Sequence, residues 1–172
     1  AWLQQQDLNE AEFFWKEHLA SLEGPTKLSF KNIIPENQEK DYDTYSLSLS
    51  SEETEEIKRF AQEHDLTLNT VIQGAVGLVL KAYTQQQEVI MGVTVSGRSI
   101  DLLGVEEMVG LFINTLPLKI TYSPTENTLS FLKKLQEQTQ RLNDYAYTPL
   151  AQNQSWSGVN QSLVDVIFVF EH

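Results

Sequence analysis

The sequence contains no cysteine, and this absence removes several kinds of chemistry. Disulfide bonds, thiolate metal sites and cysteine nucleophiles are all excluded. Histidine is also scarce: the three residues do not form an HxxxH or HExxH pattern, so we expect no metal site. His18 and His64 are expected to be solvent-facing side chains of helices.

Positive charge is the next shortage. The chain has 12 Lys and Arg against 24 Asp and Glu, which gives a net charge of −12. Nucleic acids and anionic membranes both require clustered positive charge, so neither is an expected partner. No apolar run approaches the ~20 residues of a membrane-spanning helix. The start, AWLQQQDLNE, lacks the basic and apolar regions of a signal peptide. We therefore expect a cytoplasmic location, and a first residue other than Met suggests a fragment.

What is present fits a folded α/β domain, since 41% of the residues are apolar and 21% are charged. Helical spacing of apolar residues predicts helices at 9–22, 51–64, 69–83 and 128–143. Ser50 to Glu53 form a capping box for the second of these helices, and Asn127 is the predicted N-cap of the fourth. The helix at 69–83 is apolar nearly all round, which is typical of a buried central helix.

Alternating or β-branched segments predict strands at 42–49, 88–95, 111–122 and 163–170. Pro117 indicates an edge strand or a bulge. Residues 144–162 are predicted to be a loop. This order of elements favours a mixed β-sheet packed against helices.

The residues taken alone give no complete active site. Gly92 to Ser99 nearly matches a phosphate-binding loop, but Arg98 replaces its lysine and Val93 to Val95 continue a strand. Ser96 has no local histidine to activate it, so a serine nucleophile is not expected.

Several motifs taken together resemble the condensation domains of nonribosomal peptide synthetases. Val109 to Leu118 (VGLFINTLPL) resembles the fifth core motif of that family, (I/V)GxFxNT. Gly92 to Arg98 resembles the strand ending in SGR that precedes it, and Tyr147 to Ala151 lies where the sixth motif is expected. The last strand resembles a segment ending in VFEN, with His172 in place of the Asn. These motifs occur in the family's order and cover essentially the whole chain.

The resemblance implies a chloramphenicol acetyltransferase-like half-domain. The catalytic signature of the family, HHxxxDG, is absent. Residues 1–172 are therefore expected to be the C-terminal subdomain, without the N-terminal half that carries the catalytic motif. The family joins a donor acyl or peptidyl thioester to the amine of an acceptor aminoacyl thioester. The resemblance implies that this half supplies one wall of the substrate tunnel and is inactive alone.

The implied partners are the N-terminal condensation subdomain, the upstream and downstream peptidyl carrier domains and the adenylation domain of the same synthetase. Phosphopantetheine would arrive on the carriers, and no cofactor is expected to be bound directly. An isolated half is also expected to self-associate through its exposed partner surface. Two alternatives stay open, namely a non-catalytic module that binds carrier proteins and part of another acyltransferase of the superfamily.

The motifs name a set of candidate tunnel residues. Ser96 is the first choice for a hydroxyl near the amine or thioester, although a local backbone contact fits a strand-end serine equally well. Asn114 and Thr115 are expected either to pin the subdomain interface or to face the tunnel, and the structural role is favoured. Arg98 is expected to form an ordinary ion pair, with pairing across the subdomain boundary or with a phosphopantetheine phosphate as the alternatives. The full set is Ser96, Gly97, Arg98, Gly110, Phe112, Asn114 and Thr115.

Overall fold

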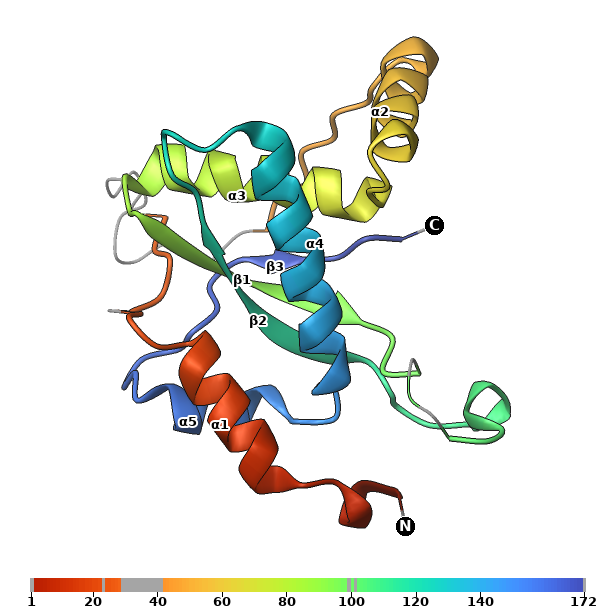
Figure 1. Ribbon diagram of the computed structural model, residues 1–172, viewed down its shortest axis with the longest axis vertical. Coiled ribbons are helices and arrows are strands. Elements are labelled where there is room, and N and C mark those ends of the chain that lie inside the picture. The colour runs from red at the N-terminus through yellow and green to blue at the C-terminus, as the bar shows by residue number, and fades with distance from the viewer. Residues whose placement is uncertain (1, 23, 29–41, 99, 101, 172) are drawn as a thin grey trace.

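A three-stranded mixed sheet forms the centre of the computed structural model, which describes residues 2–22, 24–28, 42–98, 100 and 102–171. The strand order is β2-β1-β3 (Figure 1). β1 (Glu88–Val95) pairs antiparallel with β2 (Asn114–Thr121) and parallel with β3 (Ile167–Phe168). The predicted fold class, a mixed sheet packed against helices, is confirmed.

Helices cover the sheet and extend beyond it. They are α1 (Leu8–His18), α2 (Ser51–Glu63), α3 (Leu68–Thr84), α4 (Thr128–Asp144) and α5 (Leu150–Ser157), with short 3₁₀ helices η1 (Trp2–Gln5) and η2 (Val105–Glu107). α3 and α4 pack on each other and on the sheet, whereas α1 packs on α5 (Figure 1). α2 projects away from the sheet beyond the start of α3 (Figure 1).

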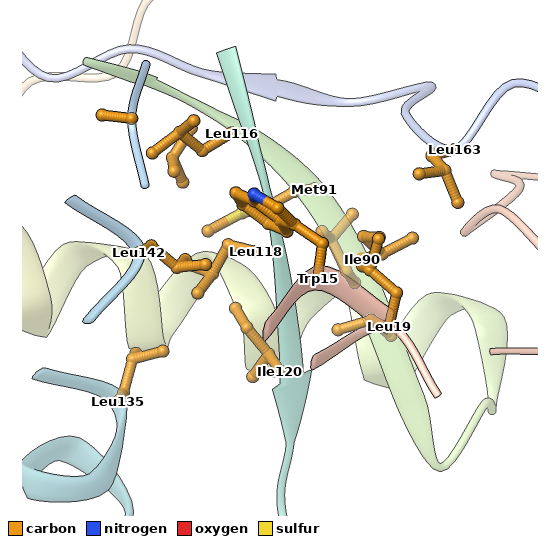
Figure 2. Close-up of a cluster of buried hydrophobic side chains, with 14 of the residues drawn as sticks. Trp15, Leu19, Ile90, Met91, Leu116, Leu118, Ile120, Leu135, Leu142 and Leu163 are labelled. Atoms are coloured by element: carbon orange, nitrogen blue, oxygen red, sulfur yellow. The ribbon is translucent and has the colours of Figure 1, made fainter. Parts of the chain in front are cut away.

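One hydrophobic core joins these elements. Figure 2 shows side chains from α1, β1, β2, α4 and the segment before β3 meeting in it, including Trp15, Met91, Leu118, Leu142 and Leu163. α3 comes very close to β2 at Gly77, where a Cβ atom would lie 2.6 Å from Cδ1 of Ile120. The absence of a side chain at Gly77 is what permits this contact.

The local signals for helix ends are confirmed. Ser50 and Glu53 form the reciprocal capping box of α2, and the Asn127 side chain accepts a hydrogen bond from the backbone N–H of Ser130. β1 has the predicted bounds, and Pro117 lies in the edge strand β2. Because one side of an edge strand has no ladder partner, the missing N–H of proline is tolerated there.

Four sequence predictions are wrong or only partly right. Residues 42–49 lie outside the observed sheet, and Tyr45 and Leu47 are 91% and 80% exposed. α5 occupies part of the predicted loop at 144–162, and β3 is much shorter than 163–170. α3 is not buried all round, because Val79 and Tyr83 are exposed.

His18 is the further correction, since its side chain is largely buried rather than solvent-facing. Its ring stacks on Phe14, and its Nε2–H donates to the backbone oxygen of Pro117 at 3.1 Å. Gln138 donates to the backbone oxygen of Lys119 on the same strand. α1 and α4 therefore supply side chains that satisfy outward-facing backbone groups of β2, which makes this edge a poor template for another strand.

Candidate functional site

Most of the predicted site residues lie in one excursion of the chain, and Asn114 and Thr115 follow it at the start of β2. Residues 96–98, 100 and 102–113, here called the arm, lie between the end of β1 and the start of β2. The arm extends well beyond the sheet and carries η2 (Figure 1). Most of the motif residues singled out from the sequence are therefore brought together.

The arm has two legs, one that leaves β1 and one that enters β2, and they meet at Gly97. Its φ angle is +66°, and a Cβ atom there would lie 1.9 Å from the backbone oxygen of Phe112. No other residue type fits both the backbone conformation and the close contact. Gly110 lies near the side chain of Phe112, and a Cβ atom on Gly110 would be 3.2 Å from Cε2 of that ring. Gly97 thus sets the spacing of the legs.

Arg98 organises the inside of the arm. Its guanidinium donates to the backbone oxygens of Val105 and Met108, the latter at 2.9 Å, and lies 4.3 Å from the ring centroid of Phe112. In the described part of the chain these are its partners, and the expected ion pair is not among them. The guanidinium is occupied in holding the arm in shape.

Ser96 is exposed at the end of β1, and its Oγ accepts a hydrogen bond from the backbone N–H of Arg98 at 3.4 Å. This is the local contact expected of a serine at a strand end. The residue is exposed, and its role in the tunnel stays a prediction.

Asn114 fastens the second leg of the arm to the chain before α5. Its Nδ2 donates to the backbone oxygens of Ala146 and Thr148, both at 2.8 Å, and its Oδ1 accepts from the N–H of Thr115. Thr148 is itself buried, and its Oγ1 accepts the indole N–H of Trp15 at 2.7 Å. These contacts support the structural role expected of Asn114.

Thr115 lies opposite Thr94 in the sheet. Its methyl group is 2.7 Å from the position that a Cβ on Gly92 would take. Thr115 therefore packs over Gly92, which is also a structural role.

Beside the arm lies an apolar groove of about 420 Å³ that sequence reasoning did not find. Trp2 and Leu3 of η1 form one side, Phe112 and Ile113 of the arm form another, and Tyr147 closes it. Trp2 packs edge-on against Tyr147 at 5.7 Å between ring centroids. Trp2 and Tyr147 belong to segments that carry the family resemblance, but nothing local in the sequence shows that they meet.

A second cleft of about 360 Å³ lies over His18 and includes Lys119 and Arg141. Burial lowers the pKa of His18 from 6.5 to about 4; the hydrogen bond to the oxygen of Pro117 opposes this shift, and the two positive charges add to it. His18 is therefore neutral near pH 7 and acts as a fixed donor to β2.

The described residues hold no cluster of three or more His, Cys, Asp or Glu side chains that could bind a metal ion. Within the same residues, no helix is long and apolar enough to cross a membrane.

Named proteins are similar in sequence to the whole chain. It is 43% identical over 175 residues to one of the linear gramicidin synthase proteins of Brevibacillus parabrevis, with 100% of this chain and 2% of that protein aligned. It is 36% identical over 171 residues to bacitracin synthase 3 of Bacillus licheniformis, covering 99% of this chain and 3% of that protein. The chain thus spans only a few per cent of the length of these relatives.

Solved structures share the fold. The first condensation domain of the calcium-dependent antibiotic synthetase, in complex with substrate analogue 3a, matches with a TM-score of 0.76 at 19% identity, over 95% of this chain and 36% of that chain. The X-domain from teicoplanin biosynthesis matches with a TM-score of 0.77 at 22% identity, over 93% of this chain and 35% of that one. The sequence profile described as "Condensation domain" matches residues 1–172, and the chain belongs to this family.

Proposed function

We propose that the chain is the C-terminal half of a peptide-bond-forming condensation domain in a nonribosomal peptide synthetase. The observation that carries the proposal is the family match over residues 1–172, together with the absence of HHxxxDG from the sequence. Since the solved condensation domain is matched over only 36% of its chain, there is room in such a domain for a second half that holds the catalytic motif.

The proposed reaction joins two carrier-bound thioesters. The acceptor α-amine attacks the donor thioester carbonyl, the new C–N bond forms, and the C–S bond breaks. The amine gives up a proton, and the donor's phosphopantetheine leaves as a thiol. Such a reaction gains most from holding the two reactants close together and from polar groups aimed at the developing oxyanion.

In this proposal residues 1–172 supply one wall of the tunnel between the two halves. Gly97 and Arg98 hold the arm in shape, Asn114 anchors it, and the exposed hydroxyl of Ser96 is available to the substrates. The adenylation domain and the two carrier domains are the proposed partners, and the cytoplasm is the proposed location.

The test is a reconstitution with the complete condensation domain of the parent protein and two carrier domains, one loaded with a donor and one with an acceptor amino acid. Mass spectrometry of the acceptor carrier detects the dipeptidyl thioester. We expect product with the complete domain and none with residues 1–172 alone. Failure of the complete domain to form product with any loaded pair would favour a binding module that uses the same fold.

The same reconstitution tests Ser96. Ser96→Ala is expected to lower the rate of peptide formation, while Ser162→Ala, another exposed serine far along the chain, leaves it unchanged. Equal rates for both variants would assign Ser96 only its local hydrogen bond to the backbone of Arg98.

A further inference from the structure

Asn153 on α5 is fully buried, with an exposed fraction of 0%. Neither polar atom of its side chain, Nδ2 or Oδ1, has a hydrogen-bond partner in the described part of the chain. A buried amide without partners loses its hydrogen bonds to water on folding and gains none in return. The closed position of α5 therefore carries a free-energy cost that is recovered when the amide of Asn153 reaches solvent.

α5 has few local features that would stabilise it as a helix. It is only eight residues long, and Pro149 at its N-cap supplies no side-chain hydrogen bond to the first turn. It contains no charged residue, so no ion pair links its successive turns. Three of its eight residues are Asn or Ser, which have lower helix propensity than Ala or Leu. The helix therefore depends on its packing against α1 and β2.

Residues 149–162, here called the strap, lie between two fixed points of the chain. Before the strap, Thr148 is buried, and its Oγ1 accepts the indole N–H of Trp15 at 2.7 Å. After the strap, Leu163 is 1% exposed and packs in the hydrophobic core. α5 itself lies at the periphery of the molecule beside α1 (Figure 1). Movement of the strap can therefore leave the rest of the fold in place.

The side chain of Gln154 holds the strap together. Its Nε2 donates to the backbone oxygens of Val159 and Gln161, so α5 is tied to the turn that follows it. Both hydrogen bonds lie within the strap and are kept when α5 and the turn move together. The partly buried Trp156 and Val159 pack against the core and oppose opening, whereas the amide of Asn153 favours it.

We propose that the strap opens and closes while the rest of the domain stays folded, and that the unpaired amide of Asn153 lowers the free energy of this opening. The inference goes beyond the proposed function and does not depend on it. Pro149 at the start of the strap also lines the groove beside the arm, so the strap carries part of the wall of that groove. Opening of the strap therefore changes the shape of the groove.

Hydrogen–deuterium exchange of the complete condensation domain, followed by peptide-resolved mass spectrometry, measures this opening. We expect the amides of α5 to exchange at least about a hundredfold faster than those in the middle of α4, because local opening costs less than global unfolding. We also expect exchange of α5 to be nearly independent of urea below the unfolding transition, whereas exchange of α4 rises with urea, because local opening exposes little surface.

Asn153→Leu tests the role of the amide, because it removes the unpaired group at similar size. We expect this variant to slow exchange of α5 at least about tenfold, since the closed state no longer contains the unpaired group. Ser155→Leu is the matched control at an exposed position of α5, and we expect it to change exchange of α5 by less than about threefold through helix propensity. Faster exchange of α4 in Asn153→Leu would reveal poor packing, and Asn153→Met, with a more adaptable side chain, then takes its place.

Wild-type α5 that exchanges as slowly as α4 overturns the proposal, because the strap is then held as firmly as the core. A urea dependence of α5 exchange as steep as that of α4 also overturns it, since exchange then requires global unfolding. Exchange of α5 in Asn153→Leu that matches the wild type or Ser155→Leu overturns the role of Asn153, because its amide is then satisfied in the closed state.

Discussion

Acidification is expected to destabilise the fold through His18. The ring is largely buried, packs on Phe14 and donates to the backbone of the edge strand β2 as a neutral imidazole. Its pKa is lowered from 6.5 to about 4 in the folded chain. Between these two pKa values the unfolded chain binds more protons than the folded chain, so the free energy of unfolding rises with pH through this window. The contribution of neutral His18 to stability is fully present above about pH 6.5 and is lost as pH falls toward 4.

The size of the effect follows from the two pKa values. At pH 5 most unfolded chains carry a protonated His18 and most folded chains do not, which removes about 2 kcal/mol of stability relative to pH 7.5. Carboxylates also titrate in this range, so the wild type is compared with His18→Gln at both pH values. The difference between the two proteins isolates the histidine.

The assay is urea unfolding followed by tryptophan fluorescence. The wild type is expected to lose about 2 kcal/mol more than His18→Gln between pH 7.5 and pH 5. His64→Gln, which leaves His18 in place, is the matched control and keeps the wild-type loss. An identical loss in the wild type and His18→Gln would show that burial of His18 does not set its protonation.

Three further substitutions test the packing of the chain, each by urea unfolding. Gly97→Ala is expected to destabilise the fold by more than about 1 kcal/mol, because φ is positive and the added methyl meets backbone; a wild-type midpoint would contradict the close contact. Asn114→Ala is expected to cost about 1–3 kcal/mol, since it leaves two buried carbonyl acceptors without a donor; a change within error would show that water replaces the amide. Gly77→Ala is expected to cost about 1–3 kcal/mol through contact with Ile120, and Ile120→Val in the same chain should recover part of the loss; no recovery would place the strain elsewhere.

Structural features that depend only on residues close together in the chain could be predicted from the sequence. The capping box at Ser50 and Glu53 and the cap at Asn127 satisfy backbone groups of their own helices, so no distant partner is needed. β1 is covered on both faces, so its sequence is a continuous run of apolar and β-branched residues. The bounds of this strand could therefore be predicted from residue type alone. The membership in the family was also predictable, because its motifs occur in order along the chain.

Features that depend on distant contacts were harder to predict. The alternation of Tyr45, Leu47 and Leu49 indicates a strand, but a strand needs a neighbour, and the observed sheet supplies none there. α5 is rich in Asn, Gln and Ser, and its apolar residues show little helical periodicity. Pro149 before it and Gly158 after it are nevertheless residue types that commonly mark the start and the end of a helix. Its packing on α1 supplies what local preference does not.

The candidate site divides in the same way. The motif residues could be named from the sequence, yet the partners of Asn114 lie about thirty residues away and the groove joins three separate segments. The prediction of a solvent-facing His18 is wrong for the same reason, because the backbone oxygen that accepts its hydrogen bond lies far along the chain on β2. Pairings of this kind follow from tertiary contacts rather than from residue type.

The proposed function makes these 172 residues one half of a domain in a much larger synthetase. The size of the native protein tests it most directly, by immunoblot of source cells with an antibody raised against this chain. We expect a band far above 19.6 kDa, since the relatives that the chain matches are many times longer. A single band near 19.6 kDa would contradict it.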